Sequence, residues 1–240
     1  MIDYCLKIAK KCLAIILGKK RFYRIQKWRY SRIASSVLKA EGVEALSCFN
    51  EITERSDKEY WLYWGTLLGA YREHDFIETD DDIDIGMFKK DISLQFVEEM
   101  ERNGFVYLHS ISDKINEDIH IAFSYKGLKF DLYSFTEPNI NNEIVGFTPG
   151  KPINGLVYPI IRTIHKFVGI SEIQFKGIFV KVLSNEADVL KTLYGDTFMK
   201  PIPKFSAEYS KKQYGPNYYL VPIEENSASV VDLKDLNLNI

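Results

Sequence analysis

The feature that most constrains this chain is a run of four aspartates among five residues, Asp80, Asp81, Asp82 and Asp84. Because side chains alternate between the two faces of a β-strand, a strand here sends Asp82 and Asp84 to the same face. Ile83 and Ile85 then enter a core on the other face. Asp80 can share the aspartate face, whereas Asp81 points away from it.

Two carboxylates held this close repel each other, so one of them is pushed toward protonation unless a cation neutralises the pair. The segment therefore predicts a divalent-metal site. A calcium-binding loop or a simply solvated loop is the alternative interpretation. The alternation with isoleucine argues against that alternative, because a solvated loop has no use for regularly placed apolar side chains.

The composition is that of a globular protein. The chain has 240 residues, enough for one good core, and its hydrophobic content of 46% and aromatic content of 14% exclude a disordered protein. A net charge of -2 gives no reason to expect nucleic-acid binding by the protein as a whole. The cysteines Cys5, Cys12 and Cys48 lack metal-type spacing and are odd in number, which predicts reduced thiols in a cytosolic protein.

The charge is unevenly distributed along the chain. Ten Lys or Arg and one acid give residues 1–33 a net charge of +9, so the remaining residues carry −11 of the total of −2. The basic residues alternate with aromatic ones, which suits an anionic membrane surface. An amphipathic helix packed on the body is an equal alternative, and an RNA-binding arm is a weaker one. The apolar run at 12–17 is too short for a signal peptide or a membrane span.

Hydrophobic periodicity predicts one α+β body with an N-terminal helical arm. Helices are expected over 2–17, 34–57, 90–103 and 186–194, with a brief helical segment over 67–73. Strands are expected over 60–64, 83–87, 105–110, 118–125, 128–135 and 177–182. Lys126-Gly127 predicts a tight hairpin between two of these strands, which should therefore be antiparallel.

Proline, glycine and asparagine predict a long loop over 136–159, of the kind that often serves as a lid or binding loop. A helical turn or two is expected over 160–168. Residues past about 223 are polar and are expected to be loosely held.

The order of motifs resembles the nucleotidyltransferase superfamily. A strand is followed by the Gly65-Thr66 turn, a helix, a strand that bears Asp82-Ile83-Asp84-Ile85, and a later strand that bears Asp131. The segment from Trp64 to Ile85 resembles the signature of the LicD-type phosphotransferases, which include fukutin and fukutin-related protein. Blocks at 175–180 and 190–195 resemble the end of those domains.

This resemblance spans about 36–203 and implies a nucleotidyltransferase-like mixed sheet flanked by helices. The expected organisation is a basic amphipathic arm over 1–33, a catalytic domain over 34–203 and a C-terminal tail over 204–240.

The resemblance also implies roles for the acidic residues. Asp82 and Asp84 are expected to be metal ligands, and Asp80 to support the same site. Asp131 is either a ligand to a second metal or the base that takes the acceptor's proton. Mg²⁺, or Mn²⁺, is the expected ion, because it prefers carboxylate and phosphate oxygens.

The donor's phosphates are expected to lie at Gly65, Thr66 and Arg72. The Gly65 backbone allows close approach, and the helix that follows offers free N–H groups to an anion. Arg72 is equally well explained as a helix-surface arginine. His120 lies next to Asp131 if the predicted hairpin pairs, although a lone histidine on a strand is more often structural.

The function that the resemblance implies is transfer of a phospho-alcohol, such as phosphocholine or ribitol phosphate, from a CDP-activated donor to a hydroxyl of a cell-surface glycan, with release of CMP. A lipid-linked acceptor and a cytoplasmic location at the inner face of the membrane go with this hypothesis. One alternative is a nucleotidyltransferase that moves NMP from an NTP to a small acceptor. Another is a catalytically silent scaffold that binds a membrane or a glycan.

Overall fold

The computed structural model describes residues 19–153, 156–202, 218–221, 226–233, 236 and 238. Four α-helices and a 3-10 helix lie in these ranges: α2 (Lys19–Arg55), α3 (Trp64–Arg72), η1 (Lys89–Asp91), α4 (Leu94–Arg102) and α5 (Glu186–Tyr194). The expected helix over 2–17 lies outside the described residues.

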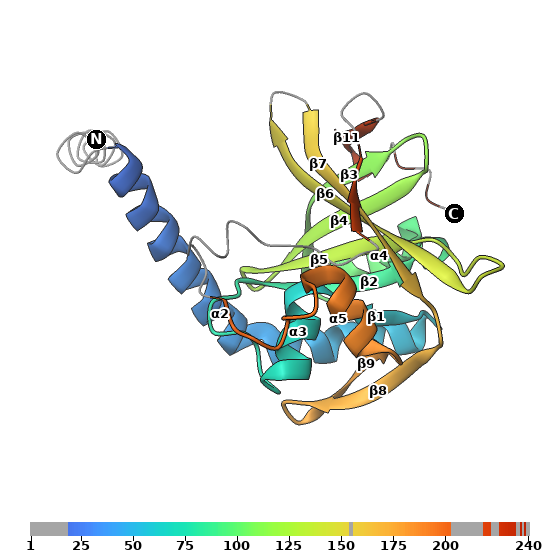
Figure 1. Ribbon diagram of the computed structural model, residues 1–240, viewed down its shortest axis with the longest axis horizontal. Helices are drawn as coiled ribbons and strands as arrows, with labels where there is room; N and C mark the ends of the chain where they lie inside the picture. The colour runs from blue at the N-terminus through green and yellow to red at the C-terminus, as the bar shows by residue number, and fades with distance from the viewer. Residues whose placement is uncertain are drawn as a thin grey trace.

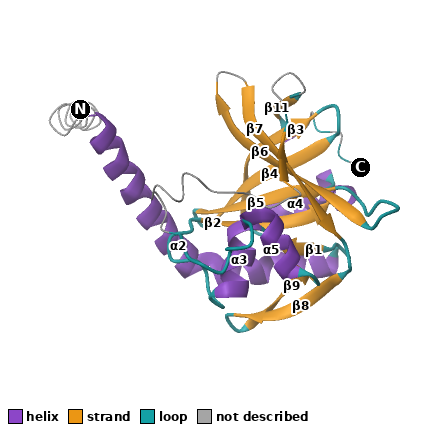
Figure 2. Cartoon of the chain, in the orientation of Figure 1, coloured by secondary structure: helices purple, strands orange, loops and turns teal. Residues whose placement is uncertain are grey.

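The strands in the described residues are β1 (Tyr60–Leu62), β2 (Asp82–Phe88), β3 (Phe105–Asp113), β4 (Asp118–Tyr125), β5 (Leu128–Phe135), β6 (Glu143–Ile153), β7 (Leu156–Lys166), β8 (Ile170–Phe175), β9 (Ile178–Leu183), β10 (Tyr218–Leu220) and β11 (Ala228–Val231). Nine of them form one sheet in which β10-β7-β6-β5-β4-β3-β11 is the main path, while β2 pairs with β5 and β1 pairs with β2. The pairing of β2 with β5 is parallel and the others are antiparallel. The expected mixed α+β architecture is therefore confirmed (Figure 2).

Helix α2 packs on one face of the sheet through β2 and β5, and it extends away from the body toward the N-terminus (Figure 1). Its buried face includes Phe49, whose ring centroid lies 5.0 Å from that of Phe130 on β5. Gly42 lets α2 approach Phe76 closely, since a Cβ at this position would lie 2.6 Å from the Phe76 ring. The helix is continuous across residue 33, so no turn separates the basic arm from the body there.

Two short hairpins depend on the same dipeptide. Lys126-Gly127 joins β4 to β5, as expected, and Lys176-Gly177 joins β8 to β9. The backbone φ angles are 48° and 85° in the first turn and 51° and 88° in the second. Both central residues thus adopt the positive φ of tight hairpin turns. Strand β8 was not expected, although its turn carries the same signal as the first.

The expected loop is confirmed over 136–142 but is wrong from Glu143 onward, and the expected helical turns over 160–168 are wrong. These residues form most of the β6–β7 ribbon, which crosses the body in Figure 1. Proline cannot donate to a ladder, so Pro149 argued against a strand. It is tolerated because β6 pairs with β5 only at Phe135↔Gly146, which leaves most of one edge of β6 outside the ladder.

The expectation of a loosely held end beyond residue 223 is also wrong for the residues described there. Strand β11 pairs with β3 from Ala228↔Asp113 to Val231↔Ser110. The Ser110 hydroxyl also donates to the Val231 carbonyl at 2.7 Å. Strand β11 adds to the edge of the sheet formed by β3, which is more than 100 residues away in the sequence. No local pattern around residue 228 predicts this pairing.

A buried ion cluster joins the β6–β7 ribbon to β3 and β4. The Arg162 guanidinium on β7 donates to Asp113 and Asp118, and all three side chains are buried. Buried charges are tolerated only when they are paired, because taking them out of water is costly. Arg162 is therefore a structural residue that holds the ribbon on the sheet.

Replacement of Arg162 by methionine is expected to lower the free energy of unfolding by about 3–5 kcal/mol, because it leaves two buried carboxylates without their cation. Urea unfolding followed by circular dichroism measures this change. The control is Arg102→Met, which removes an arginine whose side chain is 62% exposed and should cost no more than about 1 kcal/mol. Equal effects of the two substitutions would contradict the assignment.

Candidate active site

The acidic cluster is built by the parallel pairing of β2 with β5. In this register Asp82 lies opposite Lys129 and Asp84 lies opposite Asp131. One carboxylate oxygen from each of Asp82, Asp84 and Asp131 lies within 4.8 Å of the others. Ile83 is fully buried on the opposite face of β2, as the alternation predicted.

Asp84 is the most firmly held of the three. Its carboxylate accepts hydrogen bonds from the Gly65 backbone N–H at 3.2 Å and from the Tyr133 hydroxyl at 3.0 Å. Its own backbone N–H donates to the Thr66 hydroxyl at 2.9 Å. The Gly65-Thr66 turn at the start of α3 therefore positions Asp84. A direct contact of Gly65 and Thr66 with donor phosphate stays a prediction.

Asp131 is 1% exposed and is contacted by two cationic or ionisable side chains. Its Oδ2 accepts from the Lys129 ammonium, and its Oδ1 lies 3.4 Å from His120 Nε2. Burial alone would raise the pKa of Asp131, but His120 and Lys129 outweigh it and lower the pKa below its usual value. His120 thus lies beside Asp131, as the expected hairpin required.

The cluster stores electrostatic repulsion. Burial raises the pKa of Asp84 well above its ordinary value, and the nearby charges of Asp82 and Asp131 raise it further. Asp131 Oδ1 is buried, and although His120 Nε2 lies 3.4 Å from it, no residue that the structure describes gives it a hydrogen bond of regular geometry. The three aspartates offer only carboxylate oxygens as metal ligands, and such oxygens suit a hard divalent cation. The residues therefore fit a metal ion, because such an ion would relieve the repulsion and engage this oxygen.

Lys129 and Tyr133 are site residues that sequence reasoning missed. Lys129 contacts Asp131, and its Nζ lies 3.6 Å from Asp82 Oδ2. Both residues lie two positions from Asp131, so strand alternation places them on the same face of β5. This two-residue spacing was the sequence feature that could have indicated Lys129 and Tyr133 as site residues. It assigns them a role only when β2 is known to pair with β5.

Asp80 lies beside the cluster but is not one of the three carboxylates that meet within 4.8 Å. Its carboxylate packs against the backbone of Gly65, where a Cβ would lie 2.3 Å from Asp80 Oδ2. Its charge contributes to the raised pKa of Asp84. Glycine at position 65 is thus required for this close approach, and a ligand role for Asp80 stays a prediction.

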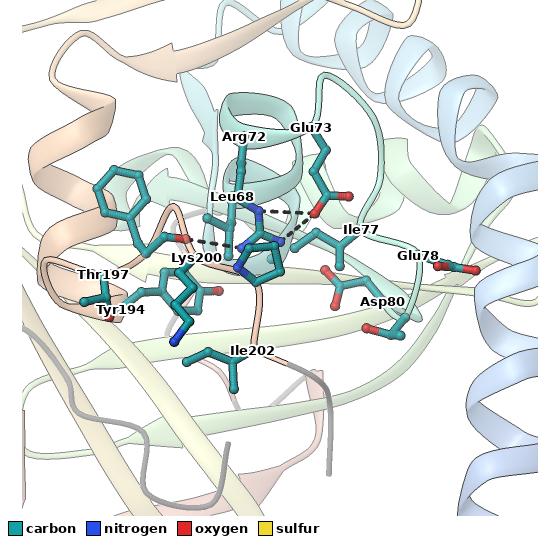
Figure 3. Close-up of a pocket in the computed structure, with 14 residues that line it drawn as sticks. Leu68, Arg72, Glu73, Ile77, Glu78, Asp80, Tyr194, Thr197, Lys200 and Ile202 are labelled. Carbon is teal, nitrogen blue, oxygen red and sulfur yellow. Dashed lines mark hydrogen bonds and ion pairs between the residues drawn. The ribbon is translucent and has the colours of Figure 1, made fainter. Parts of the chain in front are cut away.

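A cavity of about 340 Å³ is lined in part by Gly65 and Asp80, which adjoin the cluster. It is lined by parts of α3, the connector before β2 and the segment after α5: Gly65, Leu68, Arg72, Glu73, Ile77, Glu78, Thr79, Asp80, Tyr194, Thr197, Phe198, Lys200, Pro201 and Ile202. Figure 3 shows Tyr194 and Thr197 on one side of this cavity and Asp80 on the other.

Arg72 lies in the cavity wall, with its guanidinium engaged by protein atoms. It forms an ion pair with Glu73 at 2.6 Å and donates to the Phe198 carbonyl at 3.2 Å, as the dashed lines of Figure 3 mark. These contacts tie the end of α3 to the segment after α5. A phosphate-binding role for Arg72 stays a prediction, and a substrate phosphate would have to compete with Glu73.

Comparison with known proteins finds a family model that matches the part of the chain that carries this site. Residues 57–158 match the family model described as LicD/FKTN/FKRP, nucleotidyltransferase domain, and this range contains all three clustered aspartates. Residues 57–158 are thus similar to the nucleotidyltransferase domain of this family, as the motifs indicated.

The similar proteins include fukutins. Mus musculus ribitol-5-phosphate transferase FKTN is 27% identical over 161 residues, which are 66% of this chain and 33% of the mouse protein. The Homo sapiens protein of the same name is 24% identical over 159 residues, with the same two coverages. A protein named RP689 from Rickettsia prowazekii (strain Madrid E) is 32% identical over 114 residues, 41% of this chain and 43% of the relative. The chain thus matches less than half the length of each of these relatives.

Replacement of Asp84 or Asp131 by asparagine is expected to weaken Mn²⁺ binding at least about tenfold, because each change removes a charged ligand while it keeps the side chain's shape. Lys129→Met should instead tighten binding, since it removes a cation that repels the ion. Isothermal titration calorimetry measures both effects. Asp81→Asn is the control and should change the affinity less than twofold, or about 0.4 kcal/mol. Wild-type affinity in Asp84→Asn would rule out the assigned site.

Proposed function

We propose that this protein transfers a phospho-alcohol from a CDP-activated donor to a hydroxyl of a cell-surface glycan and releases CMP. The observation that carries this proposal is the group of Asp82, Asp84 and Asp131 on neighbouring strands, inside the range that matches the LicD/FKTN/FKRP family model. Two relatives are named ribitol-5-phosphate transferases, which supports a phospho-alcohol as the transferred group.

The reaction needs charge neutralisation and in-line positioning more than covalent help from the protein. The acceptor's hydroxyl oxygen attacks the phosphorus that carries the alcohol, the bond from this phosphorus to the bridging oxygen breaks, and CMP leaves with that oxygen. The hydroxyl proton passes to solvent or to the phosphate of the departing CMP. A Mg²⁺ or Mn²⁺ ion held by the three aspartates would neutralise the charge of the diphosphate.

The protein's own residues prepare the site. Gly65 and Tyr133 orient the Asp84 carboxylate, and Lys129 holds Asp131. Asp131 is almost fully buried and its pKa is lowered, and both properties favour metal holding over proton acceptance. The side chain of Asp82 is 30% exposed, so the cluster is reached from solvent on that side.

Incubation with CDP-ribitol, CDP-choline and CDP-glycerol, with and without Mg²⁺, should release CMP from at least one donor and only with the metal. Asp82→Asn and Asp84→Asn are expected to lower this rate at least about 100-fold, because both weaken the charge stabilisation. Asp188→Asn, on the exposed face of α5, is the matched control and should retain wild-type activity.

The same assay separates the alternatives. Release of pyrophosphate from ATP or CTP, without CMP from any CDP-alcohol, would favour a nucleotidyltransferase. Neither turnover nor binding of a CDP compound would favour a silent scaffold. Wild-type turnover by both Asp82→Asn and Asp84→Asn would disprove the role given to these two carboxylates.

The basic arm over 1–33 is proposed to dock on an anionic membrane at the cytoplasmic face. None of the described helices is long and apolar enough to cross a membrane. Deletion of 1–33 should abolish co-sedimentation with phosphatidylserine vesicles, because basic residues are attracted by the anionic surface. Phosphatidylcholine vesicles are the control. Unchanged binding after the deletion would disprove membrane docking by the arm.

A further inference from the structure

The cavity is not lined by any of the three clustered aspartates, but it shares two residues with their immediate surroundings. Gly65 and Asp80 both line the cavity. The same Gly65 donates its backbone N–H to Asp84, and the charge of Asp80 acts on Asp84. A ligand whose phosphates lie at the cluster would therefore place its next chemical group in this cavity.

The charges that line the cavity do not suit a further phosphate. Among the described residues that line the cavity, the acidic ones are Glu73, Glu78 and Asp80 and the basic ones are Arg72 and Lys200, so this part of the lining has a formal charge of −1. Arg72 is already engaged by Glu73 and by the Phe198 carbonyl. Phosphate binding is favoured by a surplus of cationic side chains, which the described part of this lining does not have.

The walls favour a flat and largely apolar group. Leu68 on α3 and Ile77 after it line one side of the cavity, and Ile202 lies across the cavity from them in Figure 3. Tyr194 adds aromatic surface, whereas the Phe198 ring packs against Tyr71. Apolar walls are typical of sites that enclose a ring, whereas a polyol needs a polar partner for each hydroxyl that it buries.

The carboxylates at one end of the cavity are hydrogen-bond acceptors. Asp80 and Glu78 can accept from the exocyclic amino group of a cytosine or from ribose hydroxyls. Uracil presents a carbonyl in place of this amino group and would face the same carboxylates with an acceptor. The chemistry of the lining therefore distinguishes the two pyrimidine bases.

We propose that this cavity binds the nucleoside of the donor, with the base between the walls formed by Leu68, Ile77 and Ile202 and with its amino group or the ribose hydroxyls toward Asp80. This inference rests on the proposed function, because it takes the donor to be a cytidine diphosphate compound. It goes further in assigning the base-binding wall to the segment after α5, which lies outside the matched family range of 57–158.

The test is calorimetric binding of CMP and UMP in the presence of Mg²⁺. Ile202→Trp fills the cavity from its edge and should weaken CMP binding at least about tenfold. Met199→Trp is the matched control, because Met199 belongs to the same segment, is 52% exposed and does not line the cavity. This control should bind CMP like the wild type. Glu78→Gln should narrow the preference for CMP over UMP, because it replaces an acceptor by a group that also donates.

The melting temperature and Mn²⁺ affinity of Ile202→Trp should match those of the wild type, which shows that the fold and the acidic cluster are intact. If Ile202→Trp then binds CMP as the wild type does, and keeps its KM for the donor, the cavity proposal is wrong while the proposed transfer reaction stands. If the wild type releases no CMP from any CDP-alcohol, the proposed function fails instead. Absence of CMP binding by the wild type overturns the cavity proposal itself.

Discussion

The parallel pairing of β2 with β5 is the interaction on which the rest of this structure depends. One face of the pair carries Ile83 and Phe130, both fully buried against α2 and its neighbours. The other face carries Asp82, Asp84 and Asp131, which repel one another. The hydrophobic burial on the first face offsets the cost of holding the carboxylates together on the second.

The structure also limits the repulsion locally. Lys129 places one positive charge between Asp82 and Asp131, and the Gly65 N–H and the Tyr133 hydroxyl donate to Asp84. These contacts leave a formal charge of about −2 on three carboxylates and one ammonium, which a single divalent cation balances. The site is thus prepared for a cation without being fully neutralised by the protein.

The sequence-based prediction failed in the regions whose strand partners lie far away along the chain. Pro149 suggests a loop, yet β6 accommodates it because only Gly146 pairs with β5. Strand β11 forms because β3 has an edge to be completed, although nothing near Ala228 signals that partner. Local propensity therefore failed where long-range pairing supplied the hydrogen bonds.

The sequence by itself determined the alternation at 82–85, the hairpin at Lys126-Gly127, the family resemblance and the identity of the three acids. Each of these depends on local periodicity, turn chemistry or motif order, which are properties of neighbouring residues. Only the tertiary structure decided that Lys129 and Tyr133 join the cluster and that the segment around Ile202 closes a cavity beside it. Those relations depend on the β2–β5 register and on contacts across more than 100 residues, because packing, and not sequence distance, decides which side chains meet.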